Sequence, residues 1–533
     1  MIDMERRKRV MQRSIKLGHC ICNPKQPCPC DLFKAKNICT CAGERLESPT
    51  GTVALTQTVE KAGCASKIDQ VFLKEVLQGL PKVEDPRVLV GVPAGDDAGI
   101  YDMGDGTALV QTVDVFTPSV DDPYMFGQVA AANSVSDVYA MGGTPLTALS
   151  VIGFPVRKIP DQAMNDILRG GIDKMKEAGV AIIGGHSIND DQIKAGFAVT
   201  GTIDKAKVVT NAGARPGDCL VLTKPLGTGI VAFATQIGKA SAESVRASGT
   251  SMTTLNKTAS ELMVRFGAHA ATDVTGFSLM GHLAEMARSS GVDVEVVWDD
   301  IPLFPGVADY AAAGILPGAI ERNKESCSRY VTPDPALPAE MVDLCYDAQT
   351  SGGLLIAMPE AKVADFLQAL HDADVPHAAV VGRVLEKGTG RVSLRTTGTR
   401  TISQGDAEKS VAPVQPTSPA PSESTEEDVA CCADAVKTGP ASEQAMSEME
   451  QVKAKFKAFL GAASSPHGLD AYTKQAMAIA LSVALRCEPC LEMHLKNARA
   501  KGFTQDEIDE AAWMGISFGG SPTMVFYEQM RDQ

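Results

Sequence analysis

Apolar runs of strand length alternate with helical patterns through the middle of the chain, from Leu55 to about Arg400. The runs "ALVQTVDVF", "AGFAVTGTI" and "CLVLTKPLG" are typical of strands, and "MFGQVAAANSVSDVYAMGG" and "FSLMGHLAEMARSSG" are typical of helices. This alternation predicts a mixed α/β body. Its length predicts two lobes, residues 49–205 and 206–400.

The pattern changes after residue 400. Residues 401–450 are rich in Pro, Ser, Ala and Glu and nearly free of large apolar side chains, which predicts a disordered linker. The linker contains the adjacent residues Cys431 and Cys432, which either have no specific role or carry a soft element. Residues 451–533 then show successive helical patterns, with Thr504 placed as a cap before "QDEIDEA". We therefore expect an all-α C-terminal domain.

Residues 1–48 form a small cysteine-rich module. Its cysteines stand in three CxC pairs, namely Cys20 and Cys22, Cys28 and Cys30, and Cys39 and Cys41. Such a density in an intracellular chain is typical of metal binding, and both zinc and an iron–sulfur cluster fit the pattern.

Composition narrows the class of partner. The 533 residues include 50 Lys and Arg against 65 Asp and Glu, a formal charge of −15, so we expect neither nucleic acid nor a membrane surface as a partner. The basic first residues have no apolar stretch behind them, and the longest apolar run, "AMAIALSVAL", is too short to cross a bilayer. We expect a soluble, cytoplasmic protein whose 14 cysteines are mainly thiols, metal ligands or redox pairs.

Five aspartates stand in apolar or glycine-rich surroundings, where an unpaired carboxylate is unfavourable. They are Asp96, Asp97, Asp114, Asp137 and Asp273. Asn133 precedes Asp137 by four residues, so their side chains share one helix face. The Asp96–Asp97 pair and Asp273 are expected on turns beside glycine. Gathered at one place, these carboxylates can hold Mg²⁺ and so neutralise phosphates, as phosphoryl transfer requires.

Two further stretches carry candidate chemistry. "EKAGCASKID" sets Cys64 and Lys67 three residues apart near a helix start, and taken alone the pair is a free cysteine beside a surface lysine. In "IIGGHSIND" a buried strand is expected to end at Gly184 and Gly185, with His186 in a nucleotide-contacting loop or an ordinary turn.

The order of these motifs resembles the selenophosphate synthetase (selenide, water dikinase) family over roughly residues 53–398. The resemblance rests on "LTQTVEKAGCASKI", "VGVPAGDDAGIYDMGDGTALVQTVDVF", "IIGGHSIND", "LTKPLGTG", "TDVTGFSLMGHLAEM" and "DAQTSGGLLIAM". It implies an α/β (α+β) two-lobed body like that of aminoimidazole ribonucleotide synthetase, and a homodimer formed through that body. It also implies a reaction of ATP, selenide and water that gives selenophosphate, phosphate and AMP.

The resemblance assigns roles to single residues. Cys64 matches the catalytic cysteine, and Lys67 matches an essential lysine that favours the Cys64 thiolate and contacts ATP. The expected Mg²⁺ ligands are Asp97, Asp137 and Asp273. The residues expected around ATP are Lys67, Ala94, Gly95, Asp96, Asp114, Asp137, Gly184, Gly185 and His186. Many members have a second cysteine where this chain has Ser66, so a role in resolving a selenium-bound intermediate is vacant or is filled from another domain.

The C-terminal domain carries its own motif. "RCEPCLEMH" puts Cys487, Cys490 and His494 on one helix face and resembles the carboxymuconolactone decarboxylase and alkylhydroperoxidase D-like family, which implies a redox-active dithiol. A zinc site is the rival interpretation, but it lacks a convincing fourth ligand. This chain has Gln475 where that family commonly has a glutamate, which counts against peroxidase activity and leaves dithiol–disulfide chemistry.

The main hypothesis is therefore a selenophosphate synthetase fused to a thiol-redox domain that aids selenium reduction or delivery. Its expected partners are ATP and selenide, a second copy of the chain, a higher oligomer through the C-terminal domain, and a selenium-delivery protein. The alternatives are another ATP-dependent enzyme of the same superfamily and a non-catalytic thiol scaffold that binds selenium or metal.

Overall fold

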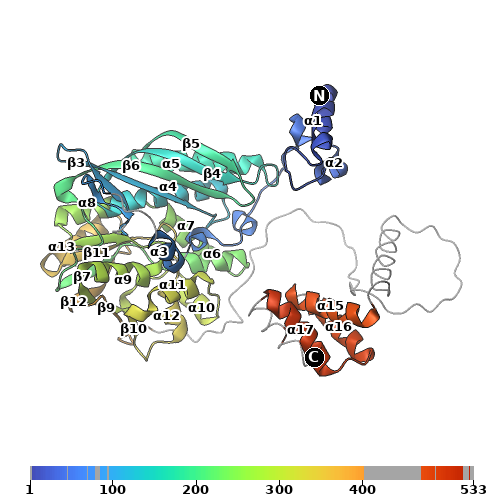
Figure 1. Ribbon diagram of the computed structural model, residues 1–533. Coiled ribbons are helices and arrows are strands. Elements are labelled where there is room, and N and C mark those ends of the chain that lie inside the picture. The colour runs from blue at the N-terminus through green and yellow to red at the C-terminus, as the bar shows by residue number, and fades with distance from the viewer. Residues whose placement is uncertain are drawn as a thin grey trace. The chain divides into compact units, whose positions relative to one another are not determined.

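The computed structural model describes residues 3–44, 46–68, 70–78, 84–92, 95–400, 470–485, 488–519 and 527. The chain divides into two compact units, Met1–Pro416 and Thr417–Gln533, and each is described by itself (Figure 1). The expected linker with Cys431 and Cys432, and the site residues Ala94 and Cys487, lie outside the described residues.

The first lobe of the body is built on a six-stranded sheet of order β1-β2-β3-β6-β4-β5. Its strands are β1 (Val88–Val90), β2 (Gly99–Asp102), β3 (Thr107–Phe116), β4 (Thr144–Phe154), β5 (Ala181–Asn189) and β6 (Lys194–Asp204). Neighbouring strands are antiparallel except β4 and β5, which are parallel. The order leaves β5 as one edge of the sheet.

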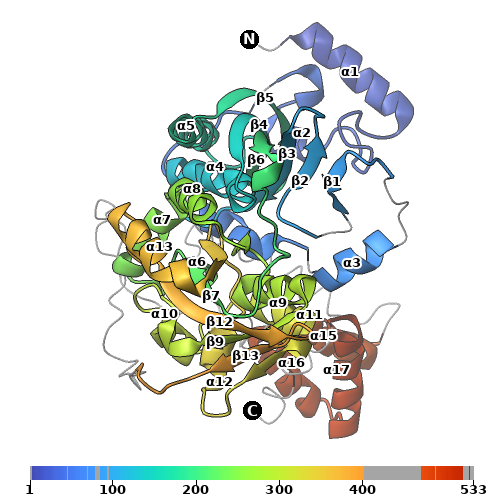
Figure 2. The same cartoon turned by 90° about the vertical axis from the view of Figure 1, so that its left-hand side faces the viewer.

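Two long helices, α4 (Pro123–Ala140) and α5 (Asp161–Ala178), cover one face of this sheet (Figures 1 and 2). They approach closely because glycines face each other. A Cβ atom at Gly127 would lie 1.9 Å from the Ile167 carbonyl oxygen, and one at Gly170 would lie 1.9 Å from the Tyr124 carbonyl oxygen. Nearly every side chain of α4 from Phe126 to Ala140 is buried, because this helix also contacts β8 (Ala270–Asp273) and α8 (Lys257–Phe266) of the second lobe. Its polar residues therefore lie at the junction of the lobes.

The second lobe contains a seven-stranded sheet of order β10-β13-β9-β12-β7-β11-β8. Its strands are β7 (Asp218–Leu222), β8 (Ala270–Asp273), β9 (Val292–Val297), β10 (Val331–Pro333), β11 (Leu354–Pro359), β12 (Ala379–Lys387) and β13 (Val392–Arg395). The pairs β10–β13 and β13–β9 are parallel and the others antiparallel. Its helices are α6 (Thr228–Gln236), α7 (Ala242–Thr253), α8 (Lys257–Phe266), α9 (Ser278–Ser290), α10 (Val307–Ala312), α11 (Ala319–Cys327), α12 (Ala339–Leu344) and α13 (Glu360–Asp372). The predicted two-lobed α/β body is confirmed.

Short elements precede the first lobe. They are α1 (Met4–Leu17), α2 (Asp31–Lys36), α3 (Gln70–Gln78) and the 3-10 turns η1 (Thr40–Ala42), η2 (Leu55–Thr58) and η3 (Gly63–Ser66). Further 3-10 turns are η5 (Lys205–Lys207), η6 (Trp298–Asp300) and η7 (Ser328–Tyr330).

The C-terminal unit is helical, as predicted, with α15 (Ala471–Ala484), α16 (Glu488–Ala500) and α17 (Gln505–Gly519). Its core includes Ile479, Leu491 and Ile508. The predicted cap at Thr504 is confirmed. The Thr504 hydroxyl accepts a bond from the Glu507 amide at 3.3 Å, and the Glu507 carboxylate accepts one from the Thr504 amide at 2.8 Å, a reciprocal capping box. Among the described residues, no helix is both long and apolar enough to span a membrane.

Candidate active site

Three of the predicted aspartates converge where the lobes meet. Asp97 lies in the turn before β2, Asp137 lies on α4, and Asp273 ends β8. One carboxylate oxygen from each lies within 4.8 Å of the other two. Asp97 and Asp273 each hold a buried oxygen, Oδ2, with no hydrogen-bond partner. Such a group of oxygens fits a divalent cation, because its charge and coordination would satisfy the orphaned atoms.

The electrostatics of these aspartates agree with that fit. Burial, followed by the charges of the neighbouring carboxylates, raises the pKa of Asp97 and of Asp137 well above the ordinary value. Burial raises the pKa of Asp273 to about 6. Three mutually repelling buried carboxylates are unfavourable without a cation. The arrangement is therefore built for a positive charge.

Hydroxyl groups orient the carboxylates. The Thr272 hydroxyl donates to Asp97 Oδ1 at 2.8 Å, and the Thr112 hydroxyl donates to Asp137 Oδ2. Asp96, expected near ATP, accepts bonds from the backbone amides of Asp97 at 3.0 Å and Asn211 at 3.2 Å. Asp96 thereby fixes the turn that presents Asp97.

Lys67 and Asp114 form an ion pair beside this centre. Lys67 Nζ lies 2.7 Å from Asp114 Oδ1 and 2.9 Å from Oδ2. Burial lowers the pKa of Lys67, but the charges of Asp114, Cys64 and Asp137 and the hydrogen bond to Asp114 together raise it by more, so the lysine stays charged. Asn133, one turn before Asp137 on α4, donates to Asp114 as well.

Cys64 lies buried in η3, where it contacts residues that are distant from it in the sequence. Its amide donates to the Thr350 hydroxyl at 2.9 Å, and its sulfur lies 3.9 Å from Asn133 Oδ1, which also accepts from the Ser351 amide at 2.8 Å. No site role was predicted for Thr350 or Ser351. The feature of the sequence that could have indicated them is the polar run "DAQTSGG" between apolar stretches.

Lys67 favours the Cys64 thiolate, as expected, but its charge does not outweigh the effect of burial. Burial raises the pKa of the Cys64 thiol to about 12, and the charge of Lys67 lowers it only in part because Asp114 opposes that charge. The thiol is therefore protonated near neutral pH. Ser66, in place of the second cysteine, donates to the Gly63 carbonyl at 2.8 Å and closes the 3-10 turn.

A buried lysine that was not predicted as a site residue lies near the aspartate centre. Lys224, in "LTKPLGTG", donates to the carbonyl oxygens of Thr254 at 2.7 Å and Ser351 at 3.0 Å. Burial lowers its pKa to about 7, and the charge of Asp273 works in the opposite direction. It is a second basic group on the second-lobe side of the aspartate centre.

The loop or turn that was predicted at "IIGGHSIND" is not formed. Gly184, Gly185 and His186 lie within the continuous strand β5, and almost the whole strand is exposed. Its pairing places Gly185 opposite Ser150 of β4, at the edge of the sheet and three strands from β3, which holds Asp114. The strand was expected to be buried because its residues are apolar, but no element of the described chain lies beyond its outer edge. Gly95 is exposed, with a φ of 64°, next to Asp96.

The C-terminal motif is held by a hydrogen-bond network. Cys490, which takes part in a disulfide, and His494 lie one turn apart on α16. Gln475 Nε2 lies 2.9 Å from the His494 carbonyl oxygen and 3.2 Å from His494 Nδ1, and Lys501 Nζ donates to Gln475 Oε1 at 3.0 Å. Burial, followed by the charge of Lys501, lowers the pKa of His494. The substituted position thus contacts the motif histidine directly.

In the N-terminal module, Cys22 and Cys41 form a disulfide. This differs from the expectation that all six cysteines are metal ligands, since two of them are bonded to each other. The other four cysteines of the module, Cys20, Cys28, Cys30 and Cys39, are thiols.

Comparison with known proteins identifies the family. A selenide, water dikinase from Pelobacter propionicus is 44% identical over 341 residues, which make up 64% of this chain and 98% of that protein. The chain belongs to the selenide, water dikinase family. A family member from Nitratidesulfovibrio vulgaris is 46% identical over 339 residues, 63% of this chain and 96% of that protein.

The domain families agree with this membership and extend it. Residues 95–203 match the N-terminal domain and residues 215–395 the C-terminal domain of AIR synthase related proteins. Residues 450–527 match the carboxymuconolactone decarboxylase family, which confirms the second resemblance. Among solved structures, thiamine-monophosphate kinase from Stenotrophomonas maltophilia is 18% identical with a TM-score of 0.42, over 62% of this chain and 96% of that chain. The dikinase assignment rests on the sequence relatives.

Proposed function

We propose that this chain synthesises selenophosphate from selenide, ATP and water, and releases AMP and phosphate. The observation that carries the proposal is the convergence of Asp97, Asp137 and Asp273 beside the Lys67–Asp114 pair, in a chain of the selenide, water dikinase family. Phosphoryl transfer depends on positioning and on neutralising charge, and this centre offers both.

Asp97, Asp137 and Asp273 are the residues that would hold Mg²⁺. When bound, the metal supplies positive charge to the phosphate oxygens of ATP. The chain's own part is to fix the three carboxylates through Thr272, Thr112 and the Asp96 turn. Gly95 leaves the backbone beside this turn open to the nucleotide.

Lys67 connects the nucleotide to the thiol. Its ammonium has three donors, and the phosphates of ATP can compete for them with Asp114. A lysine that moves from Asp114 toward Cys64 lowers the pKa of the thiol more strongly, because its positive charge is then closer to the sulfur. We infer that ATP binding turns Cys64 toward the thiolate, the form that accepts a selenium donor.

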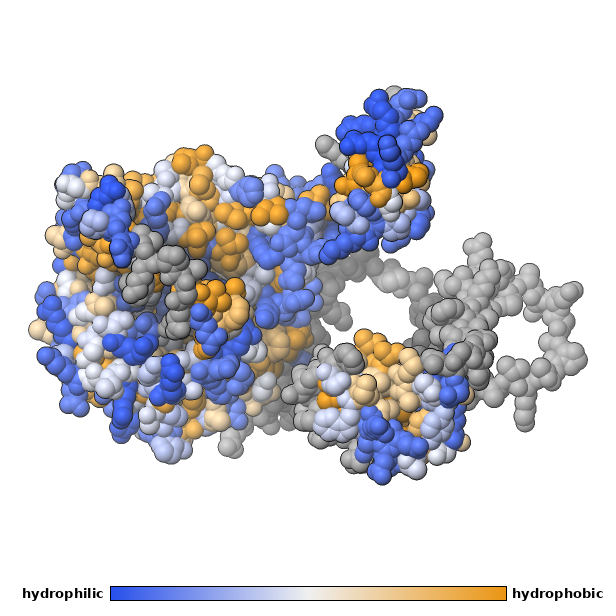
Figure 3. Space-filling model, in the orientation of Figure 1, coloured by the Kyte–Doolittle hydropathy of each residue, from blue (hydrophilic) through white to orange (hydrophobic). Residues whose placement is uncertain are grey.

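The homodimer proposal is supported by the outer face of the first sheet. Strand β5 has a free edge, and the uncovered face exposes large apolar side chains, which are Val113, Leu149, Ile183 and Ile188. Figure 3 shows apolar residues at the top of the body, where β5 lies in Figure 1. A second copy of the body on this face would bury them, and His186 of one copy would then reach the nucleotide of the other. We expect Ile183→Lys with Ile188→Lys to give monomers in light scattering, and Ile237→Lys, another exposed apolar position, to leave the dimer intact.

For the C-terminal domain we propose thiol–disulfide exchange in the cytoplasm. One thiolate of Cys487 and Cys490 attacks the sulfur of a glutathione-bound selenide, GS–Se⁻, which forms a mixed disulfide and releases hydrogen selenide. The second thiolate resolves the mixed disulfide, giving the Cys487–Cys490 disulfide and glutathione. The dithiol is oxidised by two electrons and the selenium is reduced.

The synthetase function is tested with purified protein, ATP and Mg²⁺, with and without selenide. We expect AMP and selenophosphate only when selenide is present, detected by chromatography and ³¹P NMR. Turnover of ATP independent of selenide would point to another enzyme of the superfamily, and no turnover would contradict the proposal.

The redox step is tested with Cys487→Ser/Cys490→Ser in the full chain. The rate on free selenide should match that of the unmodified protein, and the rate on glutathione-bound selenium should fall clearly. Equal rates on both donors would contradict a role for the dithiol and leave the synthetase assignment untouched.

A further inference from the structure

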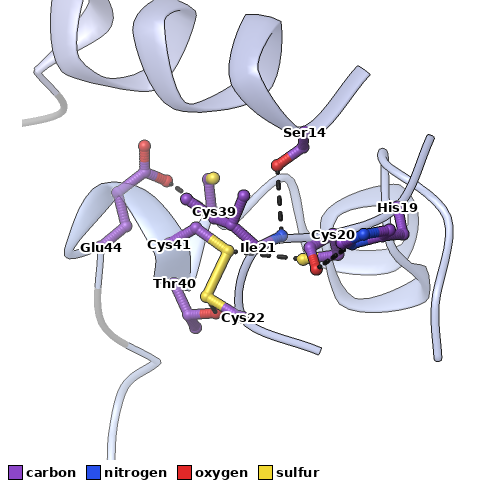
Figure 4. The surroundings of a disulfide bond; sticks show 9 residues. All are labelled: Ser14, His19, Cys20, Ile21, Cys22, Cys39, Thr40, Cys41 and Glu44. Carbon is purple, nitrogen blue, oxygen red and sulfur yellow. Dashed lines mark hydrogen bonds between the residues drawn. A yellow bond between two sulfur atoms is a disulfide. The ribbon is translucent and has the colours of Figure 1, made fainter. Parts of the chain in front are cut away.

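The N-terminal module holds a cluster of sulfur atoms that the dikinase reaction does not use. The disulfide of Cys22 and Cys41 lies beside the thiol of Cys20, whose sulfur is 3.4 Å from that of Cys41 (Figure 4). The sulfurs of Cys20, Cys22 and Cys41 all lie within 4.8 Å of one another. Among the described residues, two groups have such metal-ligand spacing, and the other is the aspartate centre.

The remaining cysteines of the module line one small pocket with two members of this cluster. The pocket is bounded by Cys20, Cys28, Cys30, Cys39 and Cys41, with Phe33 and Val10 among its apolar walls. Cys20 and Cys39 are buried, and Cys28 and Cys30 are half-buried. Three CxC pairs that are separate in sequence thus meet at one place. A fourth thiolate is available to any ion bound by Cys20, Cys22 and Cys41.

The loops that carry these cysteines are also held by contacts other than the disulfide. The guanidinium of Arg7 on α1 is buried and donates two hydrogen bonds to the Glu44 carboxylate, one of them at 2.6 Å from Nε. Glu44 accepts from the Cys39 amide at 2.9 Å, and Arg7 also donates to the carbonyl oxygen of Asn37. The Ser14 hydroxyl accepts from the Ile21 amide at 3.3 Å. The cysteines are therefore positioned even when Cys22 and Cys41 are reduced.

We propose that the reduced module binds one Zn²⁺-class cation through Cys20, Cys22, Cys41 and one thiolate of the same pocket, and that the Cys22–Cys41 disulfide is its oxidised, metal-free form. Tetrahedral zinc takes four thiolates at about 2.3 Å, which sets neighbouring sulfurs roughly 3.8 Å apart. The spacing in the cluster is compatible with that value after small side-chain rotations.

The exchange between the two forms balances with a low-molecular-weight disulfide as the oxidant. The thiolate of Cys22 or Cys41 attacks the disulfide RSSR, forms a mixed disulfide and releases RS⁻. The other thiolate then closes the Cys22–Cys41 bond and releases the second RS⁻. Zinc leaves because two of its four ligands are consumed, and the two remaining thiolates take up protons. A dithiol reductant reverses the change.

The test uses the full chain in the Cys487→Ser/Cys490→Ser background, so that zinc on the C-terminal dithiol is not counted. Protein reduced and loaded with Zn²⁺ under anaerobic conditions, then desalted, should retain about one zinc per chain. Oxidation with glutathione disulfide should release that zinc to a chromogenic chelator while mass spectrometry maps a new Cys22–Cys41 bond. Zinc retained after this bond forms, or no zinc in the reduced protein, would overturn the proposal. An iron–sulfur chromophore in anaerobically purified protein would do the same.

Variants locate the ligands. Cys20→Ser, Cys22→Ser and Cys41→Ser should each lower retained zinc at least about tenfold, because a three-ligand site binds far more weakly. One of Cys28→Ser, Cys30→Ser and Cys39→Ser should do the same and so identify the fourth ligand. Cys219→Ser removes a half-buried thiol of β7 and should change nothing. Full zinc retention by Cys22→Ser would contradict the assignment even if all variants fold.

Discussion

The ammonium of Lys67 is bound to the carboxylate of Asp114, at 2.7 Å and 2.9 Å from its two oxygens, and the thiol of Cys64 is directed toward Asn133. The lysine that was expected to activate the cysteine is therefore engaged elsewhere. Its positive charge still acts on Cys64, but the negative charge of Asp114 acts against it, and burial dominates both. Cys64 is in a resting, protonated state that a ligand of Lys67 can change.

This balance predicts the effect of Asp114→Asn on the thiol. Removing the carboxylate removes a charge that raises the pKa of Cys64 and leaves Lys67 unopposed, so the pKa should fall from about 12. Each unit of that fall gives about ten times more thiolate near pH 8. Alkylation of Cys64 by iodoacetamide, followed by peptide mass spectrometry across pH, measures the shift. Cys345, a buried thiol whose pKa is also raised to about 12, is the internal control.

The same variant should lose selenide-dependent AMP formation, because Lys67 is no longer positioned. Asp190→Asn removes a carboxylate paired with Lys194 on the surface of the same lobe and should alter neither measurement. An unchanged pH profile for Cys64 in Asp114→Asn would show that Asp114 does not control the thiol.

The metal-ligand assignment predicts opposite effects of Asp97→Asn on stability and activity. Without metal, the buried carboxylates repel one another, so replacing one by an amide should raise the Tm of the Mg²⁺-free protein by roughly 2–5 °C. The amide oxygen can still accept from Thr272. AMP formation should fall about 100-fold or more, and the rise in Tm that Mg²⁺ gives the unmodified protein should disappear.

The pH dependence of the Mg²⁺-free protein gives an independent check. Asp273 has a folded pKa of about 6, above that of an unfolded aspartate, so the folded state holds its proton more tightly. The stability from this group is complete below about pH 4 and is lost as the pH rises through about 6. Asp273→Asn should flatten this part of the profile, and Asp191→Asn, at an exposed surface position, should not. A steep profile retained in Asp273→Asn would assign the effect to another group.

The sequence predicted the features of this centre that depend on neighbouring residues in the chain, and it did not predict the contacts between residues far apart in the chain. Helix α4 and strand β3 were predicted from the local sequence, and the shared helix face of Asn133 and Asp137 follows from their spacing. The convergence of the three aspartates came from the family resemblance. No local pattern could show that Thr350 receives the amide of Cys64, because 286 residues separate them.

Strand β5 shows a second limit. Its apolar residues predict burial, and within one described chain they are exposed, because hydrophobicity does not say whether a strand is covered by its own chain or by another. The ion pair of Lys67 with Asp114 was not predicted for a related reason. Sequence proximity to Cys64 was visible, whereas the carboxylate of Asp114 comes from a strand 47 residues away.

The backbone around Cys64 predicts a strong effect of Gly63→Ala. Gly63 has a φ of 63°, and a Cβ atom there would lie 2.4 Å from the Thr350 hydroxyl oxygen that accepts from Cys64. Gly104→Ala is the matched control, since Gly104 has a φ of 89° but nothing within 4 Å of the added atom. Both changes should lower the free energy of unfolding by about 1–2 kcal/mol through backbone strain. Only Gly63→Ala should also abolish AMP formation. Full activity in that variant would show that the function of Cys64 does not depend on its contact with Thr350.

The network around His494 predicts the outcome of Gln475→Glu. Lys501 can only donate, so it fixes Gln475 with its oxygen toward Lys501 and its NH₂ group toward His494. His494 Nδ1 is then an acceptor, and the neutral ring carries its proton on Nε2. A glutamate at this position would accept from Nδ1–H instead, which moves the proton, frees Nε2 as a base, and raises the pKa of His494 by about one unit or more.

Nitrogen-15 NMR of His494 tests this directly, since the two tautomers have distinct ring shifts. The unmodified protein should show the Nε2–H form and a pKa below the usual value, and Gln475→Glu should show the Nδ1–H form. Peroxide reduction by the dithiol should rise several-fold in Gln475→Glu, because the freed base can take the thiol proton. Lys501→Met, which removes the donor that orients the amide, should give a mixture of tautomers. An Nδ1–H ring in the unmodified protein would contradict the assignment whatever the activities, because the orientation of Gln475 would then be reversed.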